Sequence, residues 1–387
     1  MTEVKGLTGL RPVRESIART TCPPYDVIKA GSRLESFLQQ NEDSLYHITL
    51  GQEPLKVLNR LRAEGLLQED PTPSFYVYEQ IYGHKMRRGV FAAVEVVDYK
   101  QGQIIRHEKT FDDKVKGRIA LREKTGYTFE PVFLLTQTPL RALLDEVVQN
   151  YPVEYEFCSD FAQASELHGI KNRIFRVEES SKEGQQLKKL LASKPLYIAD
   201  GHHRYHACLF SKQTHCLAYL CESSDASIWA YNRVINGVVK FAEIKDKLRL
   251  TKVDEFKTPQ KHSFAIYTQE GIYMLKAQQI PDDVVGRLDC SILEQELYPY
   301  LGLTHEMITD SRYFDYYAED ELEKMKECVD AGQYDLAVAL HPVSVAELIA
   351  VADAGVKNTE IIMPEKSTFF APKILSGIFI YKHTKRI

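Results

Sequence analysis

The chain of 387 residues lacks the features that mark membrane proteins and disulfide-rich secreted proteins. No apolar run approaches the roughly 20 residues that a membrane-spanning helix needs. Residues 1–13 carry charges instead of an apolar segment, so we expect no signal peptide. The cysteines number only seven, an odd count without any Cys-x-x-Cys spacing. This usage predicts reduced thiols and a cytoplasmic protein.

An excess of positive charge is also missing. The net charge is −5, so no overall field favours nucleic acid, and we expect no nucleic-acid or membrane partner. No Gly-x-x-x-x-Gly-Lys-Ser/Thr loop occurs, so any nucleotide site is of a different kind from a P-loop.

What is present fits an ordinary globular protein, with 44% apolar and 27% charged residues. Strand-like and helix-like segments alternate irregularly, which predicts an α/β to α+β fold with mixed sheets. We predict three parts: an α+β part over 1–160, a core over 161–245 and an α/β part over 246–387. The three could also pack as a single unit.

Periodicity predicts several elements of the first part. Residues 55–64 form an amphipathic helix pattern, and 75–82 and 89–99 read as strands. The link 83–88 between these strands resembles a hairpin, and its basic residues are interpreted as a solvated loop. Residues 46–49 alternate as a strand does.

The most informative stretch lies near residue 200. Leu196 to Ala199 is a short apolar run typical of a buried strand, and Asp200 and Gly201 form a turn dipeptide. Tyr205 and Cys208 then begin the apolar face of a helix. The sequence therefore predicts a strand, a tight turn and a helix start.

The first turn of that helix carries His202, His203 and Arg204, where helix stability favours acidic residues. Free N–H groups, the helix dipole and an arginine fork together favour an anion, so we predict that residues 200–204 bind phosphate. Two alternatives stay open. Gly201 and a histidine could serve only the turn and packing, or Asp200, His202 and His206 could hold a metal.

Two more segments offer carboxylates. The strand that begins at residue 104 ends in His107, Glu108 and Thr110, and a glutamate beside a histidine suits a general base. An ordinary surface strand end with a local ion pair is the alternative. Tyr25 and Asp26 follow two prolines at a turn, where Asp26 either caps a helix or belongs to a site.

Residues 363–373 have proline near both ends and lead into a last strand. Glu365 adds a possible base or metal ligand to this loop. Earlier in the chain, Asn232 and Arg233 offer either a second anion contact or an ordinary salt bridge. The loop of residues 363–373 is rich in hydrogen-bond donors and can wrap an anion. A plain packed loop is the alternative. The donors of this loop are Lys366, Ser367, Thr368 and Lys373.

The order of these motifs resembles a large bacterial and archaeal family of uncharacterised function, over nearly the whole chain. Members of that family are often encoded beside enzymes of the phosphorylated serine pathway. The motifs that carry the resemblance are residues 11–12, 23–28, 107–110, 200–205 and 363–373.

The central motif also resembles the Gly-x-His-Arg signature of the superfamily of ParB-like proteins, sulfiredoxin and free serine kinases. That resemblance implies a ParB-like strand–turn–helix core in which Gly201, His203 and Arg204 contact phosphate. His202 stands where sulfiredoxin has its catalytic cysteine, so we do not expect sulfiredoxin chemistry. The DNA-binding helices of ParB are not recognisable.

Together these features predict phosphoryl transfer on a small hydroxylated metabolite, with serine or phosphoserine as the best candidate. Glu108, helped by His107, or else Asp26, would act as the base. A kinase would use ATP or ADP with Mg²⁺, and a phosphatase would use water. The competing prediction is a non-enzymatic nucleotide or phosphometabolite sensor. The predicted substrate contacts are Arg11, Tyr25, Thr110, Asn232, Arg233 and Glu365.

Overall fold

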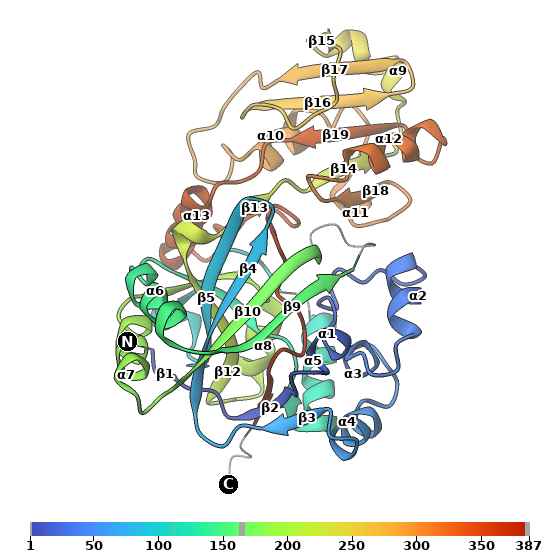
Figure 1. Ribbon diagram of the computed structural model, residues 1–387. Helices are drawn as coiled ribbons and strands as arrows, with labels where there is room; N and C mark the ends of the chain where they lie inside the picture. The colour runs from blue at the N-terminus through green and yellow to red at the C-terminus, as the bar shows by residue number, and fades with distance from the viewer. Residues whose placement is uncertain (1, 111, 162–166, 384–387) are drawn as a thin grey trace. The chain divides into compact units, whose positions relative to one another are not determined.

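The computed structural model describes residues 2–110, 112–161 and 167–383. The chain forms two compact units, one of residues 1–226 and 372–387 and the other of Ser227–Ala371 (Figure 1). The predicted division into parts over 1–160, 161–245 and 246–387 stays a prediction.

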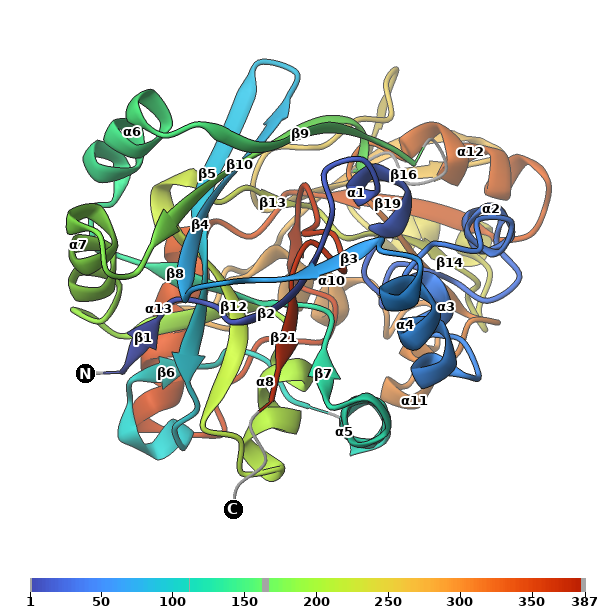
Figure 2. The same ribbon diagram turned by 60° about the horizontal axis from the view of Figure 1, so that its bottom comes forward.

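The first unit is built on a mixed nine-stranded sheet of described residues (Figures 1 and 2). Its main path runs in the order β6-β11-β8-β12-β5-β4-β10-β9, with β1 paired to β5. The strands are β1 (Val4–Lys5), β4 (Ser74–Tyr82), β5 (Lys85–Glu95), β6 (Ile104–Ile105), β8 (Val132–Thr136), β9 (Val153–Asp160), β10 (His168–Glu178), β11 (Leu196–Asp200) and β12 (His215–Glu222).

The position of β11 in the sheet explains why the residues after Ile105 and the residues after Asp200 lie close together. β11 runs parallel to β6, with Leu196 opposite Ile104, and antiparallel to β8. The carboxyl ends of parallel neighbours meet at one edge of a sheet. The segments that follow Ile105 and Asp200 therefore emerge side by side. Parallel and antiparallel pairs in one sheet confirm the predicted mixed α/β to α+β class.

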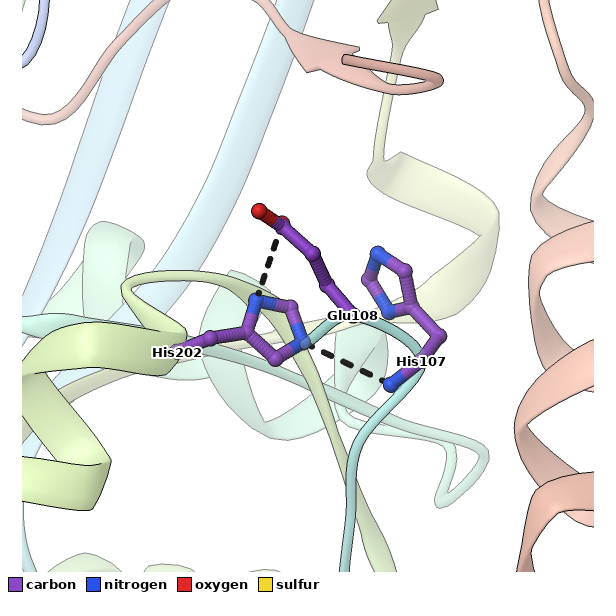
Figure 3. A group of neighbouring side chains, drawn as sticks. All are labelled: His107, Glu108 and His202. Carbon is purple, nitrogen blue, oxygen red and sulfur yellow. Dashed lines mark hydrogen bonds and ion pairs between the residues drawn. The ribbon is translucent and has the colours of Figure 1, made fainter. Parts of the chain in front are cut away.

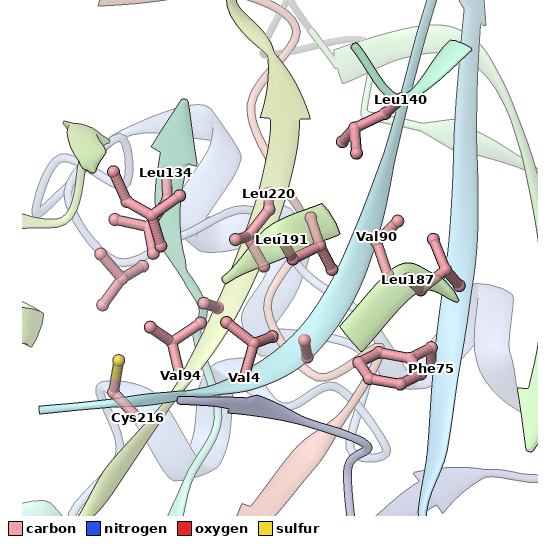
Figure 4. Packing of buried hydrophobic residues seen from close by; sticks show 14 of the residues in the cluster. Val4, Phe75, Val90, Val94, Leu134, Leu140, Leu187, Leu191, Cys216 and Leu220 are labelled. Atoms are coloured by element: carbon pink, nitrogen blue, oxygen red, sulfur yellow. The ribbon is translucent and has the colours of Figure 1, made fainter. Parts of the chain in front are cut away.

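The two faces of this sheet are packed differently. One face buries an aliphatic cluster that includes Val90, Val94 and Leu220 beneath Leu187 and Leu191 of α7 (Figure 4). The other face carries aromatic rings, which come from alternate positions of the same strands because successive side chains point to opposite faces. These rings belong to Tyr78, Phe91, Phe133 and Tyr219. Phe379, just before β21 (Ile380–Lys382), packs against Phe91 from outside this sheet.

Helices and a small sheet complete the first unit. The four-stranded sheet joins β2 (Gly9–Pro12), β3 (Leu67–Glu69), β7 (Tyr127–Thr128) and β21 (Ile380–Lys382), so the C-terminal strand pairs with the N-terminal region. The helices are α1 (Ile17–Thr20), α2 (Arg33–Gln39), α3 (Tyr46–Thr49), α4 (Pro54–Ala63), α5 (Asp112–Thr125), α6 (Arg141–Asn150), α7 (Lys182–Leu191) and α8 (His202–Phe210).

Helix α3 corrects the predicted strand at residues 46–49. Tyr46, Ile48 and Thr49 are all buried, and the Thr49 N–H donates to the Leu45 carbonyl at 2.9 Å. Four residues are too few for alternation to distinguish a strand from a buried helical turn. The predicted helix at 55–64 and the strands at 75–82 and 89–99 are confirmed, within a few residues at their ends, as α4, β4 and β5.

The second unit holds a six-stranded sheet in the order β15-β17-β16-β19-β14-β18 and a two-stranded pair, β13 with β20. The strands are β13 (Ile228–Trp229), β14 (Asn232–Ile235), β15 (Leu250–Val253), β16 (Ser263–Thr268), β17 (Gly271–Lys276), β18 (Phe314–Tyr317), β19 (Leu336–Leu340) and β20 (Phe369–Phe370). The helices are α9 (Phe241–Ile244), α10 (Asp289–Glu296), α11 (His305–Ile308), α12 (Leu322–Asp330) and α13 (Val345–Lys357).

Two expectations from the sequence concern membrane-spanning helices and the state of the cysteines. Within the described ranges, every helix is too short or too polar to cross a bilayer. All seven cysteines are free thiols.

Candidate phosphate-binding site

The predicted strand–turn–helix is confirmed as β11, Gly201 and α8. Gly201 adopts φ +92°, a left-handed conformation that glycine takes without a steric penalty. A Cβ at this position would also lie 3.0 Å from Nε of Arg204, because that side chain folds back over the turn. The first turn of α8 contains no acidic residue. Gly201 is therefore required both by the turn and by the packing of Arg204.

The Arg204 guanidinium is held inside the protein. It donates to the Pro131 carbonyl and lies 3.3 Å from Asp200 Oδ1 and 3.6 Å from Asp26 Oδ2. Only 7% of its side chain is exposed. Burial alone would lower the pKa of Arg204, but the two carboxylates raise it above its ordinary value. Arg204 thus fixes the turn and joins it to Asp26 as well as adding positive charge.

A second cation completes this cluster. Lys373 Nζ donates to Asp200 Oδ2 at 2.9 Å, and both side chains are largely buried. Burial opposes ionisation of Asp200, but Lys373 and Arg204 hold its pKa well below the usual range. The cluster of Asp26, Asp200, Arg204 and Lys373 therefore balances two negative charges against two positive ones.

The strand end at residue 107 also reaches the turn. His202 Nδ1 lies 3.5 Å from Glu108 Oε2, and His202 Nε2 accepts the backbone N–H of His107 at 3.5 Å (Figure 3). Both histidine side chains are buried, whereas 30% of the Glu108 side chain is exposed. Burial lowers the pKa of His107 to about 4 and that of His202 well below its ordinary value. Both rings are therefore neutral near pH 7.

His203 and His206 have different surroundings. His203 is half-buried, and burial followed by the charges of Lys114 and Arg204 lowers its pKa to about 4. His206 packs against Phe210 and Tyr99. The metal-ligand-like group among the described residues combines His202 with His107 and Glu108, so the alternative set with Asp200 and His206 is not assembled.

Asp26 lies in a turn, and the helix that follows begins after Ser32. Ser32 Oγ accepts the Glu35 N–H at 3.1 Å, so Ser32 is the cap and the capping role considered for Asp26 is wrong. One third of the Asp26 side chain is exposed.

Tyr25, the neighbour of Asp26, contacts two further charged residues. The Tyr25 N–H donates to Glu130 Oε1 at 3.0 Å, and its ring lies under the Arg118 guanidinium, 3.9 Å from the ring centroid. Neither Arg118 nor Glu130 was predicted at the site. They come from α5 and the segment before β8, and only their tertiary contacts reveal them.

Arg11 and Thr110, two predicted substrate contacts in the first unit, differ in burial. Arg11 is buried, at 2.6 Å from Asp70 and 2.8 Å from Glu154, and it also donates to the Tyr155 hydroxyl. Thr110 is half-buried, two residues after Glu108. Their roles as substrate contacts stay predictions.

Arg87 corrects the interpretation of residues 83–88 as a solvated loop. Its side chain is fully buried between the rings of Phe133 and Tyr219. It donates to Gln80 Oε1 and to the Pro372 carbonyl, while Gln80 Nε2 donates to the Lys373 carbonyl at 2.9 Å. β4 and β5 thus hold the backbone that presents Lys373.

The other predicted residues belong to the second unit. Lys366 Nζ lies 5.3 Å from the centre of the Tyr231 ring, and Ser367 Oγ donates to the Pro364 carbonyl at 2.6 Å. Asn232 Oδ1 accepts the Leu340 N–H at 3.3 Å, and Arg233 is buried and donates to the Tyr231 carbonyl. Thr368 and Glu365 are half-buried. The anion-binding and substrate-binding roles of this group stay predictions.

Comparison with protein families matches residues 4–291 to the family described as "Protein of unknown function (DUF1015)". The chain belongs to this family. The predicted membership of an uncharacterised family is therefore confirmed. No curated protein matches this chain significantly.

Several solved structures are similar to this chain at low identity. A conserved hypothetical protein from Pyrococcus furiosus has 12% identity and a TM-score of 0.37, covering 77% of this chain and 98% of its own. A mutant free serine kinase in complex with ADP has 12% identity and a TM-score of 0.39, covering 77% and 95%. SbnI from Staphylococcus aureus, truncated at its C-terminus, has 12% identity and a TM-score of 0.42, covering 75% and 87%.

Proposed function

We propose that the protein is a phosphoryl-transfer enzyme that acts on a small hydroxylated metabolite. The observation that carries the proposal is the convergence of four separate segments in the first unit. Asp26, Glu108 and Lys373 all approach the turn at 200–204. Serine or phosphoserine is the first candidate substrate, because the Gly201, His203 and Arg204 pattern resembles that of the superfamily that includes free serine kinases.

The start of α8 is the phosphate end of the proposed site. Its first-turn N–H groups and helix dipole favour an anion, and Gly201 places no side chain in the way. Lys373 and Arg204 are cations at this turn, but Asp200 and Asp26 offset them. A phosphate dianion therefore binds well here only with an additional cation.

Mg²⁺ fits that requirement. It prefers carboxylate and phosphate oxygens, and Asp26 and Asp200 offer carboxylates that are 33% and 20% exposed. When bound with a nucleotide, the ion would neutralise phosphate charge. Asp26 and Asp200 are the residues that would hold it.

Glu108 is the proposed general base. Its carboxylate is partly exposed at the sheet edge beside the helix start, where a hydroxyl next to a bound phosphate would lie. In the kinase direction it accepts the proton of the metabolite hydroxyl as that oxygen attacks the terminal phosphoryl group of ATP or ADP, whose bridging P–O bond breaks to release ADP or AMP. In the phosphatase direction it accepts a proton from the water that attacks the phosphorus of phosphoserine. The P–O bond to serine then breaks, serine leaves with a proton on its oxygen, and inorganic phosphate remains.

The test is incubation of the full chain with serine, Mg²⁺ and ATP or ADP, and separately with phosphoserine alone. Products are detected by ³¹P NMR and chromatography. We expect conversion in one direction, with loss of roughly 100-fold or more in kcat for Glu108→Gln. No conversion of serine or phosphoserine removes these substrates. Tight binding of ADP or phosphoserine without any turnover would identify a sensor instead.

A further inference from the structure

His202 opens α8, and its side chain points toward the strand end that carries His107 and Glu108. Only 2% of it is exposed, and both ring nitrogens face the segment of His107 and Glu108 (Figure 3). The His107 ring packs edge-on against it, with centroids 4.5 Å apart and planes at 89°. The imidazole is therefore held in place by the strand end that carries the proposed base.

The partner of Nε2 decides the tautomer of His202. A backbone N–H can only donate, so Nε2 must accept the His107 N–H and carry no proton. With Nε2 unprotonated, the proton of the imidazole resides on Nδ1. That N–H faces Glu108 Oε2 at 3.5 Å, a long contact of the kind that tightens when a substrate binds.

This arrangement argues against two other roles for His202. A phosphate contact at Nδ1 would bring a dianion against the Glu108 carboxylate, which is unfavourable in a partly buried site. A metal on Nδ1 would force the proton onto Nε2, where it would face the His107 N–H.

We propose that His202 is a positioning residue, which orients the Glu108 carboxylate through Nδ1–H while the His107 backbone fixes its tautomer. This assignment rests on the proposed role of Glu108 as base. A carboxylate has several lone pairs, so one bond from His202 sets its rotamer and leaves accepting capacity for a hydroxyl. The phosphate contacts are then left to His203 and the α8 backbone.

Two matched variants test the role. Asn places its amide nitrogen where Nδ1 lies, whereas Gln places its own where Nε2 lies. We expect His202→Gln to lower kcat by roughly 10- to 100-fold while the KM for the phosphorylated ligand changes less than about twofold. His202→Asn should retain most of the wild-type kcat. Equal kcat for the two variants, or a loss confined to KM, would overturn the proposal.

A second measurement does not depend on turnover. Protein labelled with ¹⁵N-histidine reports each tautomer by NMR, and the signal of His202 is assigned by its loss in His202→Asn. We expect Nδ1–H with an unprotonated Nε2, perturbed in Glu108→Gln. An Nε2–H tautomer would refute the positioning role. So would zinc binding by His202, seen as one zinc ion per chain that stays bound to the wild-type protein after dialysis but is lost from His202→Gln. Absent turnover with an Nδ1–H tautomer would reject the proposed function and leave the His202–Glu108 pair intact.

Discussion

Lys373 and Asp200 form an ion pair of 2.9 Å across 173 positions of sequence. The pair ties the C-terminal segment to the turn before α8. Gln80 of β4 and Arg87 of β5 donate hydrogen bonds to the backbone carbonyls of residues 372–373. These two strands therefore help to fix the position of the Lys373 ammonium. The site is therefore part of the core of the first unit.

Lys373→Met should destabilise the protein by about 2 kcal/mol, because it leaves the buried Asp200 carboxylate with Arg204 alone. Urea unfolding followed by circular dichroism measures the change. Lys56→Met is the control, since it breaks an exposed pair with Glu53 and should cost less than about 0.5 kcal/mol. Equal effects would show that the Lys373 pair adds nothing beyond a surface pair.

Gly201→Ala should destabilise the protein by about 2 kcal/mol, because alanine resists φ +92° and its Cβ would push against Arg204. The opposite result is expected for Gly117→Ala in α5, where the added methyl meets no atom within 4 Å. There the free energy of unfolding should rise by about 0.5–1 kcal/mol. A harmless Gly201→Ala would contradict the proposed geometry of the turn.

Acidification should weaken the fold through His107. Burial lowers the pKa of this histidine to about 4, against about 6.5 in an unfolded chain. The unfolded state therefore binds more protons between these values. The contribution of His107 is complete above pH 6.5 and is lost as the pH falls toward 4.

The expected loss through His107 between pH 7.5 and 4.5 is about 2–3 kcal/mol. Urea midpoints of His107→Gln, compared with wild type across this range, should show a correspondingly flatter pH profile. Parallel profiles for the two proteins would mean that His107 is not the titrating group. The depressed pKa of Asp200 acts lower still, below pH 4.

Removal of Mg²⁺ should weaken nucleotide binding. Asp26 and Asp200 cancel the charges of Arg204 and Lys373, so a phosphate group needs a further cation. Calorimetric titration with ADP should give a dissociation constant at least about tenfold higher in EDTA than in Mg²⁺. Unchanged affinity would show that the protein's own cations suffice.

The sequence by itself determined the structures that depend on neighbouring residues. Strand β11, the turn at Gly201 and the start of α8 follow from a contiguous apolar run, a turn dipeptide and helical spacing. The amphipathic helix α4 was predictable for the same reason. At residues 46–49, local alternation indicated a strand, whereas the structure forms a short helix in which three of the four side chains are buried.

Tertiary structure alone decided which distant groups meet. The pairing of β6 with β11 brings Glu108 to His202, and the folding-back of Arg204 brings Asp26 to the turn. Nothing local marks Arg87 as buried, because its environment consists of Phe133, Tyr219 and a backbone segment almost 300 residues away. Sheet pairing and burial are properties of the whole unit, so spacing along the chain cannot contain them.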